Sequence, residues 1–373
     1  MRYSAAMAFA NDIIHWYEAH GRDLPWRNTS DPYHIWLSEI ILQQTRVEQG
    51  MSYYLRFVKE FPTVNDLAHS TEERVLKCWQ GLGYYSRARN LHAAAQHIAF
   101  DLSGQFPNTY DDILSLRGVG PYTAAAIASF AFGLPYPVID GNVFRVVSRL
   151  HGIDLPIDST KARPYFLQVL NKMIDRDRPA AFNQALMDFG ALVCKPQAAD
   201  CKSCIFADRC VAWRTGRVAL LPVKGGRPAV RNRYFYYFVF VIRRSRKSFP
   251  IYTVMQCRKQ QDIWKGLYEF PLLEPPNVLV ADDLLNTATT HVQKLWPMMR
   301  EVRPSIVGTD VHKLSHQTIH ATFLRVEAII DDDVQIDGLV ELAKVDALPV
   351  SRLTDRFLAT FSFGDTNGLV KCK

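Results

Sequence analysis

Four cysteines in one short stretch are the residues of this sequence best suited to bind a metal. Cys194, Cys201, Cys204 and Cys210 are spaced C-x6-C-x2-C-x5-C, and the charged residues between them predict an exposed loop. Thiolates are soft ligands, and four within one loop can converge on one centre, either an iron–sulfur cluster or a tetrahedral zinc ion. The spacing alone leaves both open.

Two carboxylic acids upstream of the cysteines could perform acid–base chemistry. Glu39 lies in an apolar helical stretch, and its same-face neighbours are Ile35, Trp36, Leu42 and Gln43. Such surroundings desolvate a carboxyl group and keep a proton available near neutral pH, whereas the alternative is an ordinary solvated charge. Asp140 precedes Gly-Asn at the start of another predicted helix, where it can cap the helix or face a substrate.

A glycine-containing turn between these acids could bind a phosphate. Residues 116–123 read Leu-Arg-Gly-Val-Gly-Pro-Tyr-Thr and precede a helical stretch. Gly118 and Gly120 permit a tight turn, and Pro121 suits the first turn of the helix that follows. Free backbone N–H groups at such a helix start can bind a phosphate, although an ordinary turn between two helices has the same pattern.

The elements that must position these residues are of two kinds. Up to about residue 216, apolar residues recur at helical spacing, which predicts helices that include residues 35–57, 74–79, 88–98 and 123–132. The later sequence predicts strands at 234–242, 252–257 and 318–330, with helices at 282–295 and 351–361. We therefore expect a mostly helical domain over 1–216, a basic linker over 217–232 and a smaller α+β domain over 233–373.

The composition is that of a folded chain with a basic surplus. The 373 residues suit two domains, and 48% hydrophobic residues are enough for packed cores. The net charge is +7, and residues 214–247 contain ten Lys or Arg and no Asp or Glu, which favours an acidic partner such as nucleic acid. Because we find neither a signal-peptide pattern nor a membrane-length apolar run, we expect an intracellular protein of the cytoplasm or nucleoid without a membrane partner.

In their order along the chain, the turn at 116–123, the Asp-Gly-Asn-Val at 140–143 and the four-cysteine loop resemble the helix–hairpin–helix DNA glycosylase superfamily. Within it, they are similar to the branch that endonuclease III and MutY share. The resemblance implies a helix–hairpin–helix domain with an iron–sulfur loop at 194–210. It also implies that the four cysteines hold one [4Fe-4S] cluster and that the protein acts on duplex DNA as a monomer.

Position 122 separates the two relatives. Endonuclease III-type enzymes carry a lysine in the hairpin, whose amine attacks the sugar and permits strand cleavage. This sequence has Tyr122 there, and a phenol cannot form a Schiff base. Residues 22–27, 36–45 and 81–90 also resemble the MutY family. The resemblance therefore implies a monofunctional base-excision repair glycosylase that hydrolyses adenine from its mispair with 8-oxoguanine or G.

The resemblance to MutY also implies roles for individual residues. Glu39 would protonate N7 of adenine, Asp140 would stabilise the sugar cation, and Tyr122 and Asn142 would support them. The residues implied to form the pocket for the flipped adenine are Arg22, Leu24, Trp26, Arg27 and Gln184. The residues implied to contact or wedge the DNA are Gln44, Thr45, Leu82, Tyr84, Gly118 and Gly120.

The second domain resembles the MutT-like domain of the MutY family, most clearly at residues 263–271. No R-E-x-x-E-E-type run follows, so we expect no nucleotide hydrolysis. The resemblance implies that the loop at 313–317 recognises 8-oxoguanine, with Ser315 and His316 as its polar pair. Leu314 stands where many relatives have Phe, which still allows an apolar contact.

Two other functions remain as alternatives. One is an endonuclease III-like glycosylase-lyase for oxidised pyrimidines, against which Tyr122 and the extra domain argue. The other is a non-enzymatic iron–sulfur DNA-binding protein, against which the presence of both Glu39 and Asp140 argues. For the adenine glycosylase, we expect the cysteine loop to be remote in role from Glu39 and Asp140 and to present Lys195, Lys202 or Arg209 to phosphate.

Overall fold

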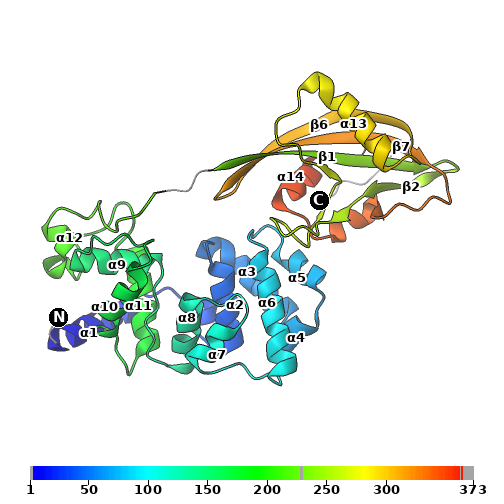
Figure 1. Ribbon diagram of the computed structural model, residues 1–373. Coiled ribbons are helices and arrows are strands. Elements are labelled where there is room, and N and C mark those ends of the chain that lie inside the picture. The colour runs from blue at the N-terminus through cyan, green and yellow to red at the C-terminus, as the bar shows by residue number, and fades with distance from the viewer. Residues whose placement is uncertain (1–2, 227–229, 362, 364–373) are drawn as a thin grey trace. The chain divides into compact units, whose positions relative to one another are not determined.

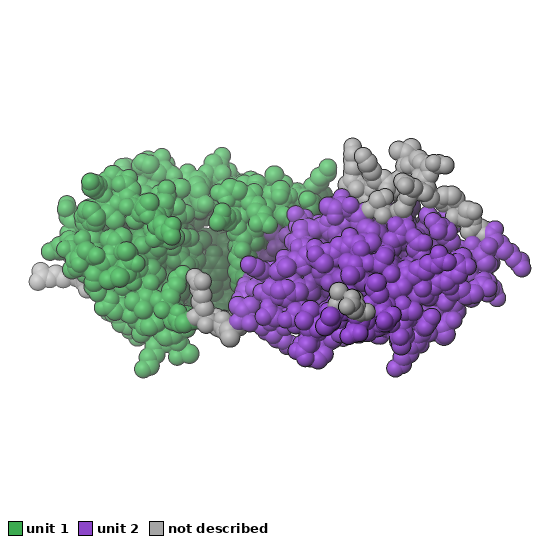
Figure 2. Space-filling model, turned by 90° about the horizontal axis from the view of Figure 1, so that it is seen from above, with its two compact units in different colours: residues 1–69, 90–227 green, residues 70–89, 228–373 purple. Residues whose placement is uncertain are grey.

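The computed structural model of the protein describes residues 3–226, 230–361 and 363, and of residues 3–6, 247–249 and 281–282 it describes the backbone alone. The chain forms two compact units, residues 1–69 with 90–227 and residues 70–89 with 228–373 (Figure 2). Residues 70–89 thus belong with the C-terminal part of the chain. The predicted linker includes residues 227–229, and the predicted second domain includes 362 and 364–373, all of which lie outside the described residues.

The first unit is built from helices, as its sequence predicts (Figure 1). Its α-helices are α1 (Tyr3–His20), α2 (Pro32–Leu42), α3 (Val47–Glu60), α4 (Val64–His69), the end of α6 (Ser86–Gln96), α7 (Tyr110–Ser115), α8 (Pro121–Phe132), α9 (Gly141–His151), α10 (Ala162–Asn171), α11 (Pro179–Leu192) and α12 (Val211–Arg214). Short turns of other helix types are η1 (Pro25–Arg27), η2 (His97–Asp101) and η3 (Ala207–Arg209). In the described part of the chain, no helix is both long and apolar enough to cross a membrane.

The single helix expected over residues 35–57 is wrong. The chain forms α2 and α3 instead, with a turn between them at residues 43–46. Gln44 in this turn has a φ of 56°, a left-handed backbone conformation that no continuous right-handed helix contains. Apolar residues keep their helical spacing on both sides of the turn, so the pattern does not reveal the break.

Two packing contacts position the functional residues of this unit. Helices α1, α9, α10 and α11 surround one core, and Phe206 from the cysteine loop is buried in it. Helix α8 packs on α2, and its buried face carries alanines from Ala124 to Ala128, whose small side chains permit a close approach. The helix that carries Glu39 therefore lies directly against the helix that begins after the glycine turn.

The second unit contains a six-stranded sheet in the order β6-β7-β1-β2-β8, with β5 paired to β1. Its elements are α5 (Glu72–Trp79), the start of α6, β1 (Arg231–Arg244), β2 (Lys247–Val254), β3 (Gln256–Cys257), β4 (Tyr268–Glu269), β5 (Leu272–Leu273), α13 (Ala281–Leu295), β6 (Arg300–Lys313), β7 (Gln317–Ile330), β8 (Leu339–Glu341), η4 (Leu342–Ala347) and α14 (Arg352–Thr360). The predicted α+β class is confirmed.

The sheet is covered on both faces, which explains the continuous apolar run in β1. Helix α13 packs Leu284 and Val292 against Phe238 and Phe240. On the other face, Phe357 of α14 stacks on Phe323 of β7 with 3.9 Å between ring centroids. The strand predicted at 252–257 is interrupted, because β2 ends at Val254 and β3 pairs with β4 instead of continuing in the main sheet.

Candidate active site

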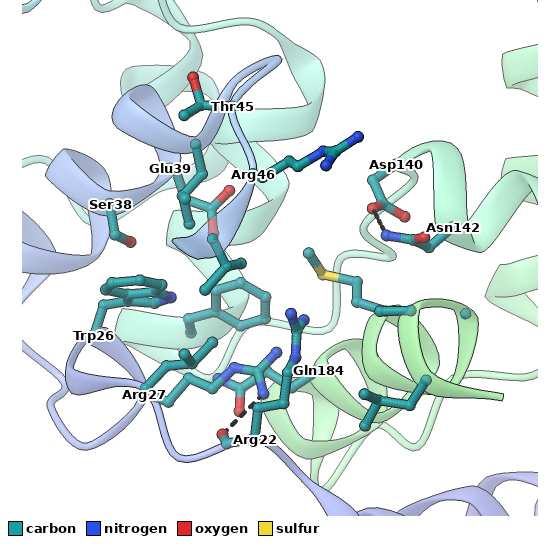
Figure 3. Close-up of a pocket in the computed structure, with 18 of the residues that line it drawn as sticks. Arg22, Trp26, Arg27, Ser38, Glu39, Thr45, Arg46, Asp140, Asn142 and Gln184 are labelled. Atoms are coloured by element: carbon teal, nitrogen blue, oxygen red, sulfur yellow. Dashed lines mark hydrogen bonds between the residues drawn. The ribbon is translucent and has the colours of Figure 1, made fainter. Parts of the chain in front are cut away.

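A cavity of about 690 Å³ in the first unit collects the predicted catalytic and adenine-pocket residues. Its volume lies within the range of roughly 300–1,000 Å³ that is usual for pockets that bind small molecules. Figure 3 shows Glu39 on one side of it and Asp140 with Asn142 on the other. The predicted site residues in its lining are Arg22, Leu24, Trp26, Arg27, Glu39, Thr45, Tyr122, Asp140, Asn142 and Gln184.

Glu39 is a buried acid with a proton to give. It lies on α2 with 6% of its surface exposed, so the solvated alternative is wrong. Burial raises the pKa of Glu39 from 4.5 to about 7, and the nearby Asp140 adds to the rise. The Tyr122 hydroxyl hydrogen-bonds to the carboxyl group, and Arg27 also opposes the rise. A carboxyl with this pKa is protonated in a large fraction of molecules near neutral pH.

Asp140 both caps α9 and lines the cavity, so its two predicted positions coexist. Its Oδ1 accepts the Val143 N–H at 2.7 Å, and its Oδ2 accepts Asn142 Nδ2 at 2.7 Å. Burial raises the pKa of Asp140, whereas these two donors and Arg145 favour its carboxylate form. Asp140 therefore has direct donors to hold its negative charge in place.

Arg145 is a residue that the sequence interpretation missed. Its Nη2 donates to Asn142 Oδ1 at 2.7 Å, and its Nε donates to the carbonyl oxygen of Cys194 at 2.7 Å. A chain of hydrogen bonds thus runs from Asp140 through Asn142 and Arg145 to the start of the cysteine loop. The signal in the sequence is an arginine three residues after Asn142, on the same helix face.

Asp188 is a second missed residue, and it orients two arginines of the cavity. Its side chain is fully buried on α11, and it accepts bidentate hydrogen bonds from Arg27 at 2.6 and 2.7 Å. Arg22 donates to it through its backbone N–H and through Nε at 2.9 and 3.0 Å. Although burial opposes it, hydrogen bonds from both arginines hold the pKa of Asp188 below its ordinary value. The available signal was an acid within the otherwise uncharged helix at 179–192.

The remaining pocket residues supply an amide and an aromatic wall. The amide oxygen of Gln184 accepts a hydrogen bond from the Tyr17 hydroxyl at 2.7 Å, which fixes the orientation of the amide. Tyr17 was also missed by the sequence interpretation. Trp26 is buried and meets Tyr54 edge-on, with 5.0 Å between ring centroids. Leu24 is buried beside them.

The glycine turn lines a second cavity of about 630 Å³, which shares Glu39, Tyr122 and Asp140 with the first. Gly118 has a φ of 80°, and a Cβ atom there would lie 2.6 Å from Asn90 Cβ, so only glycine fits. Gly120 is the N-cap of α8 and has no side-chain cap. A Cβ atom added to Gly120 would meet no atom within 4 Å, so the space beside the start of α8 is open. Gln44 lines this cavity as well.

Two of the residues predicted to contact or wedge the DNA, Leu82 and Tyr84, belong to the second unit, as does the pair predicted to recognise 8-oxoguanine. Leu82 is 6% exposed, and Tyr84 is 46% exposed with a φ of 48°. The Tyr84 hydroxyl lies 2.6 Å from Ser315 Oγ, within hydrogen-bond distance. Ser315 and His316 are exposed in the turn between β6 and β7. The structure thus brings together Tyr84 and Ser315, which the sequence interpretation placed in different groups.

The four clustered cysteines are half-buried free thiols, and two of them lie beside Arg149. Arg149 Nη1 lies 3.4 Å from Cys194 Sγ, and Cys210 Sγ lies 3.4 Å from the carbonyl oxygen of Arg149. Burial, and then the neighbouring thiols, raises the pKa of Cys201. Among the described residues, no three His, Cys, Asp or Glu side chains are arranged around a single metal ion.

The basic residues of this loop are not equivalent. Arg209 forms an ion pair with Asp12 at 2.5 Å, and its guanidinium lies over the Phe206 ring. Lys195 and Lys202 are exposed. Of the three basic residues predicted to face phosphate, Arg209 is therefore the one already engaged within the protein.

Known proteins resemble both the sequence and the fold of this chain. Residues 37–171 match the family described as HhH-GPD superfamily base excision DNA repair protein. The adenine DNA glycosylase of Buchnera aphidicola subsp. Baizongia pistaciae is 32% identical to this chain, and the matched region spans 84% of each of the two proteins. The adenine DNA glycosylase of Mus musculus is 39% identical over 60% of this chain, which spans only 45% of the mouse protein.

The helical unit also resembles solved structures. A thermostable thymine-DNA glycosylase superposes with a TM-score of 0.52 at 28% identity, over 56% of this chain and 96% of its own. An endonuclease III trapped as a covalent intermediate with DNA gives a TM-score of 0.51 at 21% identity, over 58% of this chain and 99% of its own, which shows the shared fold. The chain belongs to the adenine DNA glycosylase family, within the HhH-GPD superfamily of base excision DNA repair proteins.

Proposed function

We propose that the protein hydrolyses the N-glycosidic bond of adenine in duplex DNA, where the adenine is mispaired with 8-oxoguanine or G. The observation that carries this proposal is Glu39, a buried acid with a pKa of about 7 that shares a cavity with Asp140. An acid and a carboxylate on two sides of one cavity are the groups that glycoside cleavage needs. Family membership supports adenine as the base.

The chemistry follows from the two acids. Protonated Glu39 donates its proton to N7 of adenine, so that the C1′–N9 bond breaks and its electron pair leaves with the base. The sugar becomes an oxocarbenium ion, which the Asp140 carboxylate stabilises. A water molecule then attacks C1′ and gives a proton to Glu39, which restores the acid. The Tyr122 hydroxyl, hydrogen-bonded to Glu39, keeps the carboxyl group in place.

The adenine must leave the base stack to reach this cavity, at a cost of a few kcal/mol. Trp26 offers an aromatic wall, and Gln184 offers amide donors to the base edge. Thr45 and the two arginines held by Asp188 also line this cavity, and the glycine turn at Gly118 and Gly120, which lines the second cavity, would bind the flanking DNA. Trp26, Gln184 and the two arginines are already in contact with other protein groups, which limits the entropy lost on binding.

One assay tests this function. The protein is incubated with duplexes that carry A opposite 8-oxoguanine, and half of each sample is then treated with alkali. Strand breaks that appear only after alkali are expected, because Tyr122 cannot form the imine that leads to direct cleavage. Breaks without alkali would instead identify a glycosylase-lyase, and the absence of base release would identify a DNA-binding protein without this activity.

The turn between β6 and β7 is proposed to recognise 8-oxoguanine through Ser315 and His316, together with Tyr84. The hydrogen bond between Tyr84 and Ser315 supports this, because it joins two exposed polar groups in one place. Replacing Ser315 and His316 together by alanine is expected to reduce the preference for 8-oxoguanine over G by about thirtyfold, since each of the two lost hydrogen bonds weakens binding by roughly 1 kcal/mol. Single-turnover rates on the two duplexes measure the preference. An unchanged ratio would exclude this turn as the reader.

The cysteine loop is proposed to hold one [4Fe-4S] cluster. Its four free thiols and the buried Arg149 guanidinium fit such a group, because the positive charge balances thiolate ligands. The cluster would stabilise the loop, while Lys195 and Lys202 contact phosphate. Purified protein is expected to show broad visible absorption and about four irons per chain. Stoichiometric zinc without iron would contradict the cluster and favour the tetrahedral zinc site.

A further inference from the structure

Three neighbouring cavities of the first unit share lining residues, and together they form a track that leads away from the candidate active site. The second cavity, which shares Glu39 and Asp140 with the first, is also lined by Arg163 on α10. A third cavity, of about 680 Å³, shares Pro121 and Arg163 with the second. Because neighbouring cavities share lining residues, an extended ligand could follow them from the acids past the glycine turn to Arg163.

Arg163 stands out in this track because it is a half-buried cation for which the described residues provide no counter-ion. Burial lowers the pKa of its guanidinium, and the titratable group beside it is the Tyr110 phenol. Among the described residues, no carboxylate pairs with it. Burial of an unpaired charge is costly, so a ligand anion at this place would offset part of that cost.

The backbone around Arg163 also favours an anion. Arg163 is the second residue of α10, and no acidic residue lies in the first turn of this helix. The start of a helix is electrically positive, so Arg163 adds a cation to a positive end rather than neutralising it. The start of α8, which has no side-chain cap, lines the same track. A phosphodiester suits this place, because a guanidinium can donate two parallel hydrogen bonds to its oxygens.

We propose that Arg163 binds a backbone phosphate of the DNA strand that carries the target adenine, a role that rests on the proposed function. The strand whose base enters the first cavity must continue along the surface beside it, and the track offers that path. The third cavity extends the path to the stacked rings of Tyr110 and Tyr136, whose centroids are 4.4 Å apart, and to the exposed Arg176.

DNA binding at several salt concentrations tests this role. Replacing Arg163 with alanine is expected to raise the Kd for a duplex with A opposite 8-oxoguanine about tenfold at about 0.1 M salt. The slope of log Kd against log salt is expected to fall by about 0.9, the value for one lost phosphate contact. Arg163→Lys keeps the charge and should restore the slope. Lys161→Ala is the matched control, because it removes an exposed cation two residues away that does not line the track.

Replacing one DNA phosphate at a time by a neutral analogue identifies the phosphate that Arg163 contacts. Methylphosphonate is placed at one position at a time on the adenine strand, within three nucleotides of the target. At one position, wild-type binding should weaken about tenfold, whereas Arg163→Ala should bind the modified and unmodified duplexes equally. If Lys161→Ala lowers the slope as much as Arg163→Ala, or if every methylphosphonate that weakens wild-type binding weakens Arg163→Ala binding equally, the contact does not exist. These readouts measure binding alone, so they stand apart from a failure to release adenine.

Discussion

Replacing Glu39 with glutamine is expected to slow adenine release by about 10²- to 10⁴-fold, the usual contribution of a general acid. Glutamine has the same shape and keeps an oxygen that can accept the Tyr122 hydrogen bond, so only the transferable proton is lost. DNA binding should therefore persist within a few-fold. Single-turnover base release and equilibrium binding, measured on one duplex with A opposite 8-oxoguanine, separate the two effects.

The pH dependence of the wild-type protein checks the same role. Burial raises the pKa of Glu39 to about 7, and the proposed mechanism requires its protonated form. The rate of base release should therefore be constant well below pH 7 and fall about tenfold per pH unit well above it, once Glu39 is ionised. Glu18→Gln, at an exposed position of α1, is the control and should keep the wild-type profile. A Glu39→Gln variant with wild-type rates would remove Glu39 from the mechanism.

Replacing Asp140 with asparagine is expected to reduce base release by about 10²- to 10³-fold, the size typical for loss of one electrostatic stabiliser of a transition state. Asparagine keeps a side-chain oxygen that can accept the Val143 N–H, so the cap of α9 is preserved, and apart from the charge only the acceptor for the Asn142 amide is lost. The variant should therefore unfold at nearly the wild-type temperature while its rate drops. Thermal unfolding and single-turnover rates are the measurements.

The alanine variant at position 140 separates charge from structure. Asp140→Ala removes the helix cap as well as the charge, and loss of such a cap costs roughly 1 kcal/mol of stability. Asp140→Ala should therefore release adenine slowly and also unfold at a lower temperature, whereas Asp140→Asn should show mainly the slower release. If Asp140→Asn releases adenine at the wild-type rate, the carboxylate serves only as a cap and the proposed stabilisation of the sugar cation is wrong.

The sequence predicted those parts of the fold that leave a local pattern. The apolar spacing of 123–132 and the continuous apolar run at 234–242 correspond to α8 and β1, because each is buried in the manner that its pattern requires. The short motifs around Glu39 and Asp140 likewise predicted that these two acids act at one site, and both line one cavity. Local burial and local motifs were sufficient for these features.

Other features depend on partners far away in the sequence. Strand β6 escaped prediction because it pairs with β7 alone at the sheet edge, contains Pro304 and is exposed along much of its length. Asp188 lies 166 residues from Arg22, so its role in orienting the arginines becomes visible only in the folded chain. The turn around Gln44 could not be predicted, because apolar residues keep their helical spacing on both sides of it.

The assignment of residues 70–89 to the second unit has a consequence for how the protein could be divided. Lys77 donates to the carbonyl oxygen of Leu348, Gln80 to the Asp355 carboxylate, and Tyr85 to the carbonyl oxygen of Val350. In a chain that ends at residue 227, the segment that carries Leu82 and Tyr84 would therefore lack these hydrogen-bond acceptors. The two halves of the sequence are therefore not structurally independent. Residues 70–89 in the first half make these hydrogen bonds only when the second half is present.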